Sequence, residues 1–245
     1  MRTANPALNK KTFANMNLNA SEKMTLNGTV NRTFLLLMML LIPATYTWSM
    51  VKSGNSPSVG LFMIGGLIGG LIMAVITIFK KEWSPFTAPG YALFEGLFLG
   101  ALSALMELQF PGIVMQAVAL TFGTLFSLLF AYKSGLIKVT ENFRLGIVAA
   151  TGGIAMIYLA SIVMGLFGFN IPYIHESGLI GIGFSLFVVV IAALNLVLDF
   201  DFIESAVKHG APKYMEWYGA FGLMVTLVWL YIEILRLLSK LYSRN

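Results

Sequence analysis

The hydrophobic residues of this chain fall into seven long, nearly continuous runs separated by short polar connections. The runs cover approximately residues 33–51, 59–79, 87–106, 113–132, 144–169, 177–198 and 217–238. A helix of about 20 residues, rising 1.5 Å per residue, crosses the hydrocarbon core of a bilayer. Membrane-spanning strands are excluded because apolar and polar residues do not alternate within the runs. The pattern therefore predicts an all-α polytopic membrane protein, a bundle of seven transmembrane helices.

The segment before the first run, residues 1–32, is polar and rich in asparagine. It has too few apolar residues to form a core of its own, and such segments remain flexible or lie on a membrane surface. We therefore expect a flexible cytoplasmic N-terminal tail over residues 1–32. The transmembrane domain is expected to occupy residues 33–245.

The sixth connection, residues 199–216, is the most charged stretch of the chain. Apolar residues nevertheless continue through it at helical spacing, at Phe202, Ile203, Ala206 and Val207. Gly210 suits a helix C-terminus, and Pro212 suits the first turn of the next helix. We expect the sixth helix to continue to about His209, which leaves a turn of about three residues.

The composition agrees with a membrane protein, because 58% of the residues are hydrophobic, 11% are charged, and the mean hydropathy is +0.81. A soluble domain carries about 25% charged residues. The composition excludes a soluble enzyme, a nucleic-acid binder and a disordered protein, and the expected partner of most of the surface is the lipid bilayer. We attribute the net charge of +5 to basic cytoplasmic loops rather than to nucleic-acid binding.

The distribution of lysine and arginine predicts the orientation of the bundle. With the N-terminus inside, twelve basic residues fall on the inner side and four on the outer side. Cytoplasmic connections carry the excess of Lys and Arg in membrane proteins. The bias predicts a cytoplasmic N-terminus, an external C-terminus, and a charged 199–216 connection that faces the cytoplasm.

Ionisable residues inside the runs are the main candidates for function, because a charged side chain in lipid is costly. Glu95 lies in the middle of the third run and has no basic residue within a helical turn. Two interpretations of Glu95 remain: a position on an ion or proton path, or a protonated acid in a structural hydrogen bond. Asp199 follows Asn195 by four residues, so the two form a polar pair on one helical face at the inner mouth of the bundle. The alternative for Asp199 is an interfacial helix cap.

The other acidic residues near the helix ends have simpler interpretations. Glu204 and Lys208 are spaced for an i,i+4 ion pair, and Glu233 and Arg236 are spaced for an ion pair at i,i+3. Asp201 points about 200° around the helix from Asp199 and is the weaker sensing candidate.

Signatures of enzymes and cofactor sites are absent from the sequence. It contains no H-E-x-x-H, G-x-S-x-G or phosphate-binding loop. His175 and His209 fall in loops on opposite sides and cannot share a metal ion. We therefore expect neither a catalytic site nor a cofactor or metal centre.

Several segments resemble the Bax inhibitor family, and more closely its bacterial YccA-like branch. They are residues 5–8, 95–103, 198–204, 211–218 and 230–238, in order along nearly the whole chain. The resemblance implies a seven-helix bundle with the last helix near the centre, in the bacterial inner membrane. It also implies a pH-sensitive calcium leak in some members and regulation of membrane proteases or cell-death factors in others.

In the leak members an aspartate late in helix six pairs with an aspartate in helix seven, and Asp199 matches the first of these positions. Two nearby carboxylates share a proton or a cation, which couples pH to closure. The second position falls near Thr226, which is not acidic. Asp201, Glu216 and Glu95 are the candidates to replace the missing carboxylate.

Together these features favour a membrane cation leak or channel, linked to calcium or protons and sensitive to pH. Its sensing or gating residues would be Asp199, Glu95, Asn195, Asp201 and Thr226. The alternative is a non-conducting regulator that binds a membrane protease or another membrane protein through its basic tail and charged inner connection.

Overall fold

The computed structural model describes residues 23–53, 56–168 and 178–244, and its long elements are all helices. They are α2 (Leu26–Lys52), α3 (Ser56–Phe79), α4 (Ser84–Gln109), α5 (Ile113–Lys133), α6 (Glu141–Leu166), α7 (Leu179–Lys208) and α8 (Met215–Tyr242). A single 3-10 turn, η1 (Lys81–Trp83), precedes α4. All seven helices are long and apolar enough to cross a membrane, which confirms the predicted seven-helix membrane protein.

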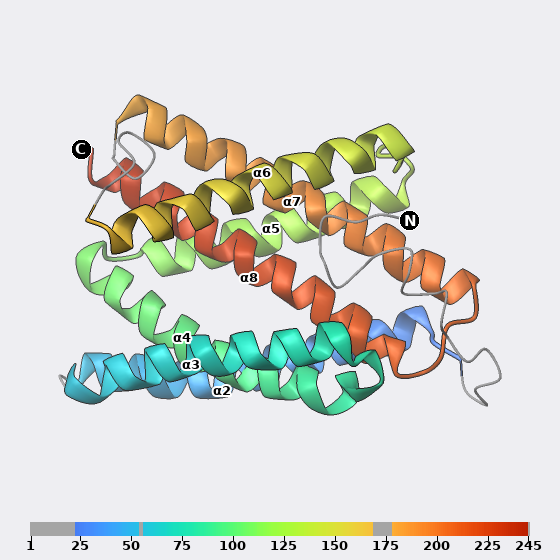
Figure 1. Cartoon of the computed structure of the whole chain (residues 1–245), viewed down its shortest axis with the longest axis horizontal. Coiled ribbons are helices and arrows are strands. Elements are labelled where there is room, and N and C mark those ends of the chain that lie inside the picture. Colours follow the sequence, from blue (N-terminus) through green and yellow to red (C-terminus); the bar gives the residue numbers. More distant parts are fainter. Residues whose placement is uncertain (1–22, 54–55, 169–177, 245) are drawn as a thin grey trace.

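The last helix lies at the centre of the bundle. Figure 1 shows α2, α3 and α4 in one layer, α5, α6 and α7 in a second, and α8 passing obliquely between them. α8 packs against α2, α4, α5 and α7, and it is the most buried of the seven spans. This is the arrangement that the family resemblance implied.

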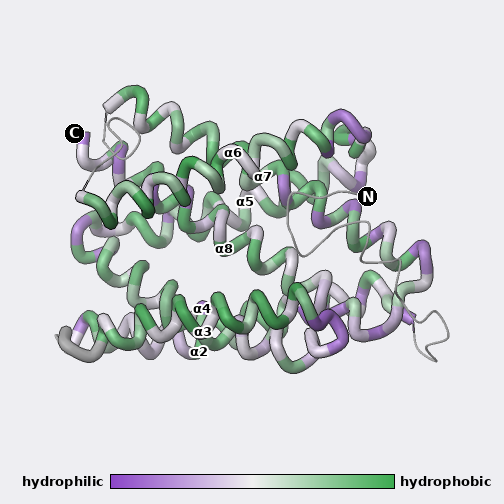
Figure 2. Tube along the Cα trace, viewed as in Figure 1, coloured by the Kyte–Doolittle hydropathy of each residue, from purple (hydrophilic) through white to green (hydrophobic). Residues whose placement is uncertain are grey.

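Helices that lie on the outside expose large apolar side chains. Leu71 of α3, Phe126 of α5 and Met156 of α6 are 63%, 63% and 73% exposed. Figure 2 shows the hydrophobic residues along the middle of the helices and the hydrophilic residues mostly near their ends. An apolar belt with polar ends is the distribution that a bilayer requires of its spanning helices.

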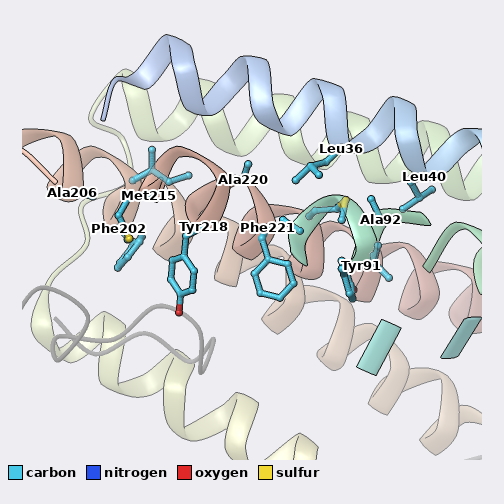
Figure 3. Packing of buried hydrophobic residues seen from close by; sticks show 14 of the residues in the cluster. Leu36, Leu40, Tyr91, Ala92, Phe202, Ala206, Met215, Tyr218, Ala220 and Phe221 are labelled. Atoms are coloured by element: carbon cyan, nitrogen blue, oxygen red, sulfur yellow. The ribbon is translucent and has the colours of Figure 1, made fainter. Parts of the chain in front are cut away.

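The largest buried cluster joins α8 to both layers. Figure 3 shows Leu36 and Leu40 of α2, Tyr91 and Ala92 of α4, Phe202 and Ala206 of α7, and Met215, Tyr218, Ala220 and Phe221 of α8. The rings of Tyr91 and Phe221 meet edge to face, with centroids 5.1 Å apart. These contacts hold α8 in place between the two layers.

Two glycines in α4 allow the backbones of α2 and α4 to meet. A Cβ atom at Gly96 would overlap the backbone oxygen of Leu40, and one at Gly100 would overlap that of Ala44. Without a hydrophobic driving force between helices in lipid, such close packing is what stabilises a helix pair. The GxxxG spacing therefore serves helix packing in this part of the bundle.

The first helix begins earlier than the hydrophobic run, inside the segment expected to be tail. α2 starts at Leu26, because Thr25 accepts a hydrogen bond from the Gly28 nitrogen as its N-cap, at 2.9 Å. Met24 is only 2% exposed and belongs to the main buried cluster. The helical bundle thus includes residues 23–32, while residues 1–22, with the family-like segment 5–8, lie outside the described residues.

The sixth helix continues beyond the apolar run as predicted, but the turn after it is longer than expected. α7 ends at Lys208, and Gly210 follows with a φ of +66°. α8 begins only at Met215, because the residues between are paired with the chain before α2. Lys23 forms an antiparallel bridge with Pro212, and the Met24 nitrogen donates to the Ala211 oxygen at 2.7 Å.

Candidate functional site

Asp199 is fully buried in α7, one turn after Asn195. The amide nitrogen of Asn195 donates to the Thr151 hydroxyl of α6 at 2.9 Å and to the Ile191 oxygen at 2.8 Å. Asn195 is itself only 3% exposed. The two residues therefore place a carboxylate and an amide inside the bundle, on the polar face that their i,i+4 spacing predicts.

Thr226 lies in α8, the helix that makes the most extensive contact with α7. It is 3% exposed and donates its hydroxyl to the Gly222 oxygen at 3.3 Å. A threonine hydroxyl can supply an oxygen ligand but carries no charge. This position therefore cannot share a proton with Asp199 as a second carboxylate would.

Two of the three candidate replacement carboxylates are bound to other groups. Asp201 accepts a hydrogen bond from Arg144 of α6 at 2.7 Å. Glu216, at the start of α8, accepts from the Thr25 nitrogen at 3.1 Å and from the Thr25 hydroxyl at 2.9 Å. These contacts give Asp201 and Glu216 structural roles between helices.

The third candidate, Glu95, lies in the α2–α4 layer and is 7% exposed. A Cβ atom added to Gly70 of α3 would stand 3.0 Å from a carboxylate oxygen of Glu95. Within the part of the chain that the structure describes, Glu95 forms no hydrogen bond or ion pair. It is a buried acid beside a glycine of the neighbouring helix, in a different layer from Asp199.

A network of charged residues ties α5, α6 and α7 together at one end of the bundle. Arg144 is 5% exposed and binds both Asp201 and Glu141. Tyr132 of α5 donates to Glu204 at 2.5 Å, and Glu204 also forms the predicted ion pair with Lys208. Sequence reasoning missed Arg144 and Tyr132 because their partners lie on other helices.

We call this end the lysine-rich end, because it carries Lys23, Lys80, Lys81, Lys133, Lys138, Lys208 and Lys213. The bonds from Thr25 to Glu216 and from Ser84 to Tyr214 lie here as well. Residues 23–25 and the connections α3–α4, α5–α6 and α7–α8 therefore lie at one end of the bundle, the end that the lysine and arginine count predicts to be cytoplasmic.

The predicted ion pair between Glu233 and Arg236 is present in α8. Glu233 is more deeply buried than its position near the end of the helix indicated. Arg236 contacts Glu233 at 3.1 Å, and Glu233 is 1% exposed. Tyr158 of α6 donates to Glu233 at 3.0 Å and accepts from Arg236 at 2.6 Å, while Trp229 donates to Glu233 at 3.3 Å. Tyr158, which the sequence did not single out, closes this network.

Lys240, one turn after Arg236, is also buried, at 5% exposure. Its ammonium donates to the Gly181 oxygen at 3.0 Å and to the Ser185 hydroxyl at 2.8 Å, both in α7. The opposite end of the bundle thus holds two cations of α8, Arg236 and Lys240, close to one buried carboxylate.

Among the described residues, no three His, Cys, Asp or Glu side chains gather to hold a metal ion. His209 contacts the Ser205 oxygen at 2.6 Å as part of the α7 C-terminus. His175 lies outside the described residues. The candidate site in the described part of the chain is centred on the buried carboxylate of Asp199 and the buried amide of Asn195.

Comparison with protein families matches residues 5–243 to the family described as Bax inhibitor 1 like. Comparison with curated proteins and with solved structures gives no match. The matched segment covers nearly all of the chain and includes all seven spanning helices. With its central last helix and seven apolar spans, this chain is an integral membrane protein that belongs to the Bax inhibitor 1 like family.

Proposed function

We propose that this chain is a membrane cation leak, linked to calcium or protons and sensitive to pH, in which Asp199 is the sensing residue. The observation that carries the proposal is the complete burial of Asp199 within a spanning helix. Acidic residues inside a bundle are costly and mark ion or proton paths in many membrane proteins. The family resemblance, which places a leak aspartate at this position, supports the same role.

The neighbours of Asp199 supply further oxygen atoms at membrane depth. Asn195 and Thr151 form a polar contact one turn away, and Thr226 is buried in the adjoining helix α8. Calcium prefers carboxylate, carbonyl and hydroxyl oxygens, and an ionised Asp199 would attract it. Protonation would remove that attraction and create a hydrogen-bond donor, so occupancy by a cation would depend on pH.

The uncharged side chain of Thr226 should make the pH dependence of cation binding at Asp199 less steep. A carboxylate pair binds a proton or a cation between two charges, whereas Asp199 would face a threonine at that position. We therefore expect weaker calcium binding and a shallower pH dependence than a paired site would have. Glu95 is proposed as a second polar position, in the α2–α4 layer, rather than as the partner of Asp199.

The test is a flux assay with purified protein in liposomes, measuring calcium and proton entry from mildly acidic to mildly basic pH. The parent is compared with Asp199→Asn and with Asp201→Asn, both checked for helix content and monodispersity. We expect Asp199→Asn to change the flux and flatten its pH dependence. Asp201→Asn serves as the matched control on the same helix, because Asp201 is bound to Arg144.

Flux that is identical for parent and Asp199→Asn at every pH would remove Asp199 from the mechanism. A parent that passes no ions would favour the alternative, a non-conducting regulator that binds a membrane protease or another membrane protein. Its contact surface would be the lysine-rich end, where the side chains of Lys208 and Glu141 are 69% and 66% exposed. We further propose the bacterial inner membrane as its location, on the family resemblance alone.

A further inference from the structure

The hydroxyl and carboxylate side chains of α4 follow a single spacing along the helix. Between residues 87 and 107 each of them is separated from the next by four or eight positions, and all remaining residues of this stretch are apolar, glycine or proline. Residues four apart are neighbours on a helical surface. We call these side chains the α4 row, and its members are Thr87, Tyr91, Glu95, Ser103 and Glu107.

The α4 row is long enough to cross a membrane and is buried over most of its length. At 1.5 Å per residue, the rise from Thr87 to Glu107 is about 30 Å, which matches the hydrocarbon core of a bilayer. Thr87, Tyr91, Glu95 and Ser103 are each no more than 7% exposed. Polar side chains at membrane depth are costly, and chains of them form the proton relays of pumps and transporters.

The first half of the row, nearer the lysine-rich end, lies against α3. The Thr87 hydroxyl accepts a hydrogen bond from Thr77 of α3 at 2.8 Å. The Glu95 carboxylate lies beside Gly70 of the same helix, and Tyr91, one turn before Glu95, is within electrostatic range of it. Because a hydroxyl both donates and accepts and a carboxylate can take up a proton, these groups can pass a proton from one to the next.

The second half of the row lies against α8 and α5. Ser103 and Tyr231 of α8 share a hydrogen bond of 2.6 Å, in which either hydroxyl can be the donor. Glu107, one turn later, accepts from the Gly112 nitrogen at 2.7 Å, next to the start of α5. Glu107 is only partly buried, so this half connects the interior with the end of the bundle opposite the lysine-rich end.

Leu99 separates the two halves. It occupies the position of the row between Glu95 and Ser103, which are about 12 Å apart along the helix axis, and it is 6% exposed. An apolar constriction of this kind excludes water and so interrupts a path for ions or protons. Glu95 is the acid next to the interruption, and among the described residues no hydrogen bond or ion pair fixes its protonation state.

We propose that protons cross the membrane along the α4 row, in two polar halves separated by Leu99, with Glu95 as the residue that takes up and releases the proton. The inference rests on the proposed function, because it requires that the protein passes ions. It deepens that function by giving protons a route in the α2–α4 layer, separate from the cation site at Asp199.

The test measures proton and calcium flux on the same preparation of purified protein in liposomes. Glu95→Gln should lower proton flux to that of protein-free liposomes, because an amide cannot take up and release the proton, and should leave calcium flux as in the parent. Leu99→Ala should raise proton flux several-fold by opening the constriction. Leu36→Ala, which shortens a fully buried leucine of α2 in the same layer, is the matched control and should not change proton flux.

Ser103→Ala supplies a test that does not depend on the folding of Glu95→Gln, and it should lower proton flux several-fold. Its control is Ser185→Ala, because Ser185 is also a buried serine bonded to a side chain of α8, but lies in α7. Parental proton flux in both Glu95→Gln and Ser103→Ala would overturn the route along α4, as would a parent that passes calcium but no protons. In both cases the proposed leak would stand, whereas a parent that passes neither ion would contradict the leak itself.

Discussion

Glu216, in the first turn of α8, receives hydrogen bonds from the nitrogen and the hydroxyl of Thr25, which precedes it by 191 residues. Thr25 in turn accepts from the Gly28 nitrogen as the N-cap of α2. One carboxylate therefore joins the start of the first helix to the start of the last. Glu216 also lies at the N-terminus of α8, where the partial positive charge of the helix dipole stabilises its carboxylate.

Replacing Thr25 by alanine should destabilise the bundle more than the loss of an ordinary helix cap. The substitution removes the N-cap contact, worth about 1 kcal/mol, and a hydrogen bond to a carboxylate, worth about 1.5 to 3 kcal/mol. The free energy of unfolding, followed by circular dichroism during titration with a denaturing detergent, measures the change. Thr140→Ala is the control, because Thr140 caps α6 by accepting from Phe143. Equal losses for both variants would show that the bond to Glu216 contributes nothing.

Gly96→Ala should separate α2 from α4. The added Cβ would overlap the backbone oxygen of Leu40, which cannot move without shifting the helix, so we expect a loss of about 2 kcal/mol. The same substitution at Gly152 of α6, where a Cβ meets open space, should leave stability unchanged or raise it by up to about 1 kcal/mol. Thermal unfolding of the two variants in one detergent compares them directly. A Gly96→Ala protein as stable as the parent would argue against close backbone contact there.

Arg236→Gln should be strongly destabilising, because it leaves Glu233 buried without its cation. Removing one partner of a buried ion pair costs about 3 kcal/mol or more, whereas an exposed pair contributes well under 1 kcal/mol. Lys208→Gln, which breaks the more exposed pair with Glu204, is the control. Adding Glu233→Gln to Arg236→Gln should restore much of the lost stability. Failure of the double variant to recover would mean that packing, and not charge, is what Arg236 supplies.

Glu95→Gln should fold as well as the parent. Glu95 forms no hydrogen bond or ion pair among the described residues, and an amide matches a neutral carboxylic acid in shape and polarity. Size-exclusion profiles and unfolding temperature measure the outcome. Loss of expression or folding in Glu95→Gln would instead show that the carboxylate is charged and paired.

The orientation of the bundle is open to a direct measurement. With twelve basic residues on the side of the tail and four on the other, a reporter fused after Asn245 should lie outside the cytoplasm. A reporter fused at Met1 should lie inside it. Two reporters on the same side would contradict the odd number of spans, and the reverse arrangement would contradict the charge rule for this protein.

The local pattern of apolar and polar residues was sufficient to predict the helices of this fold. Runs of apolar residues predicted all seven helices, and the spacing after Asp199 predicted a continuation of the sixth helix to about His209, close to the observed end of α7 at Lys208. The ion pairs of Glu204 with Lys208 and of Glu233 with Arg236 also followed from spacing, since residues three and four apart share a helical face. These features depend on neighbours in sequence, which is the information that a single chain displays.

Only the tertiary structure decided which buried acids have partners and where they lie. Arg144 binds Asp201, which is 57 residues away in sequence, and Thr25 binds Glu216, which is 191 residues away. Glu95 lies in a different layer of the bundle from Asp199. The start of α2 at Leu26 also depends on a tertiary contact, because its N-cap residue, Thr25, is hydrogen-bonded to Glu216 at the start of α8. An apolar sequence is enough to place a helix across the membrane, but it does not specify which other helix it packs against. The pairing of helices depends instead on small-residue and polar contacts between segments that are distant in sequence.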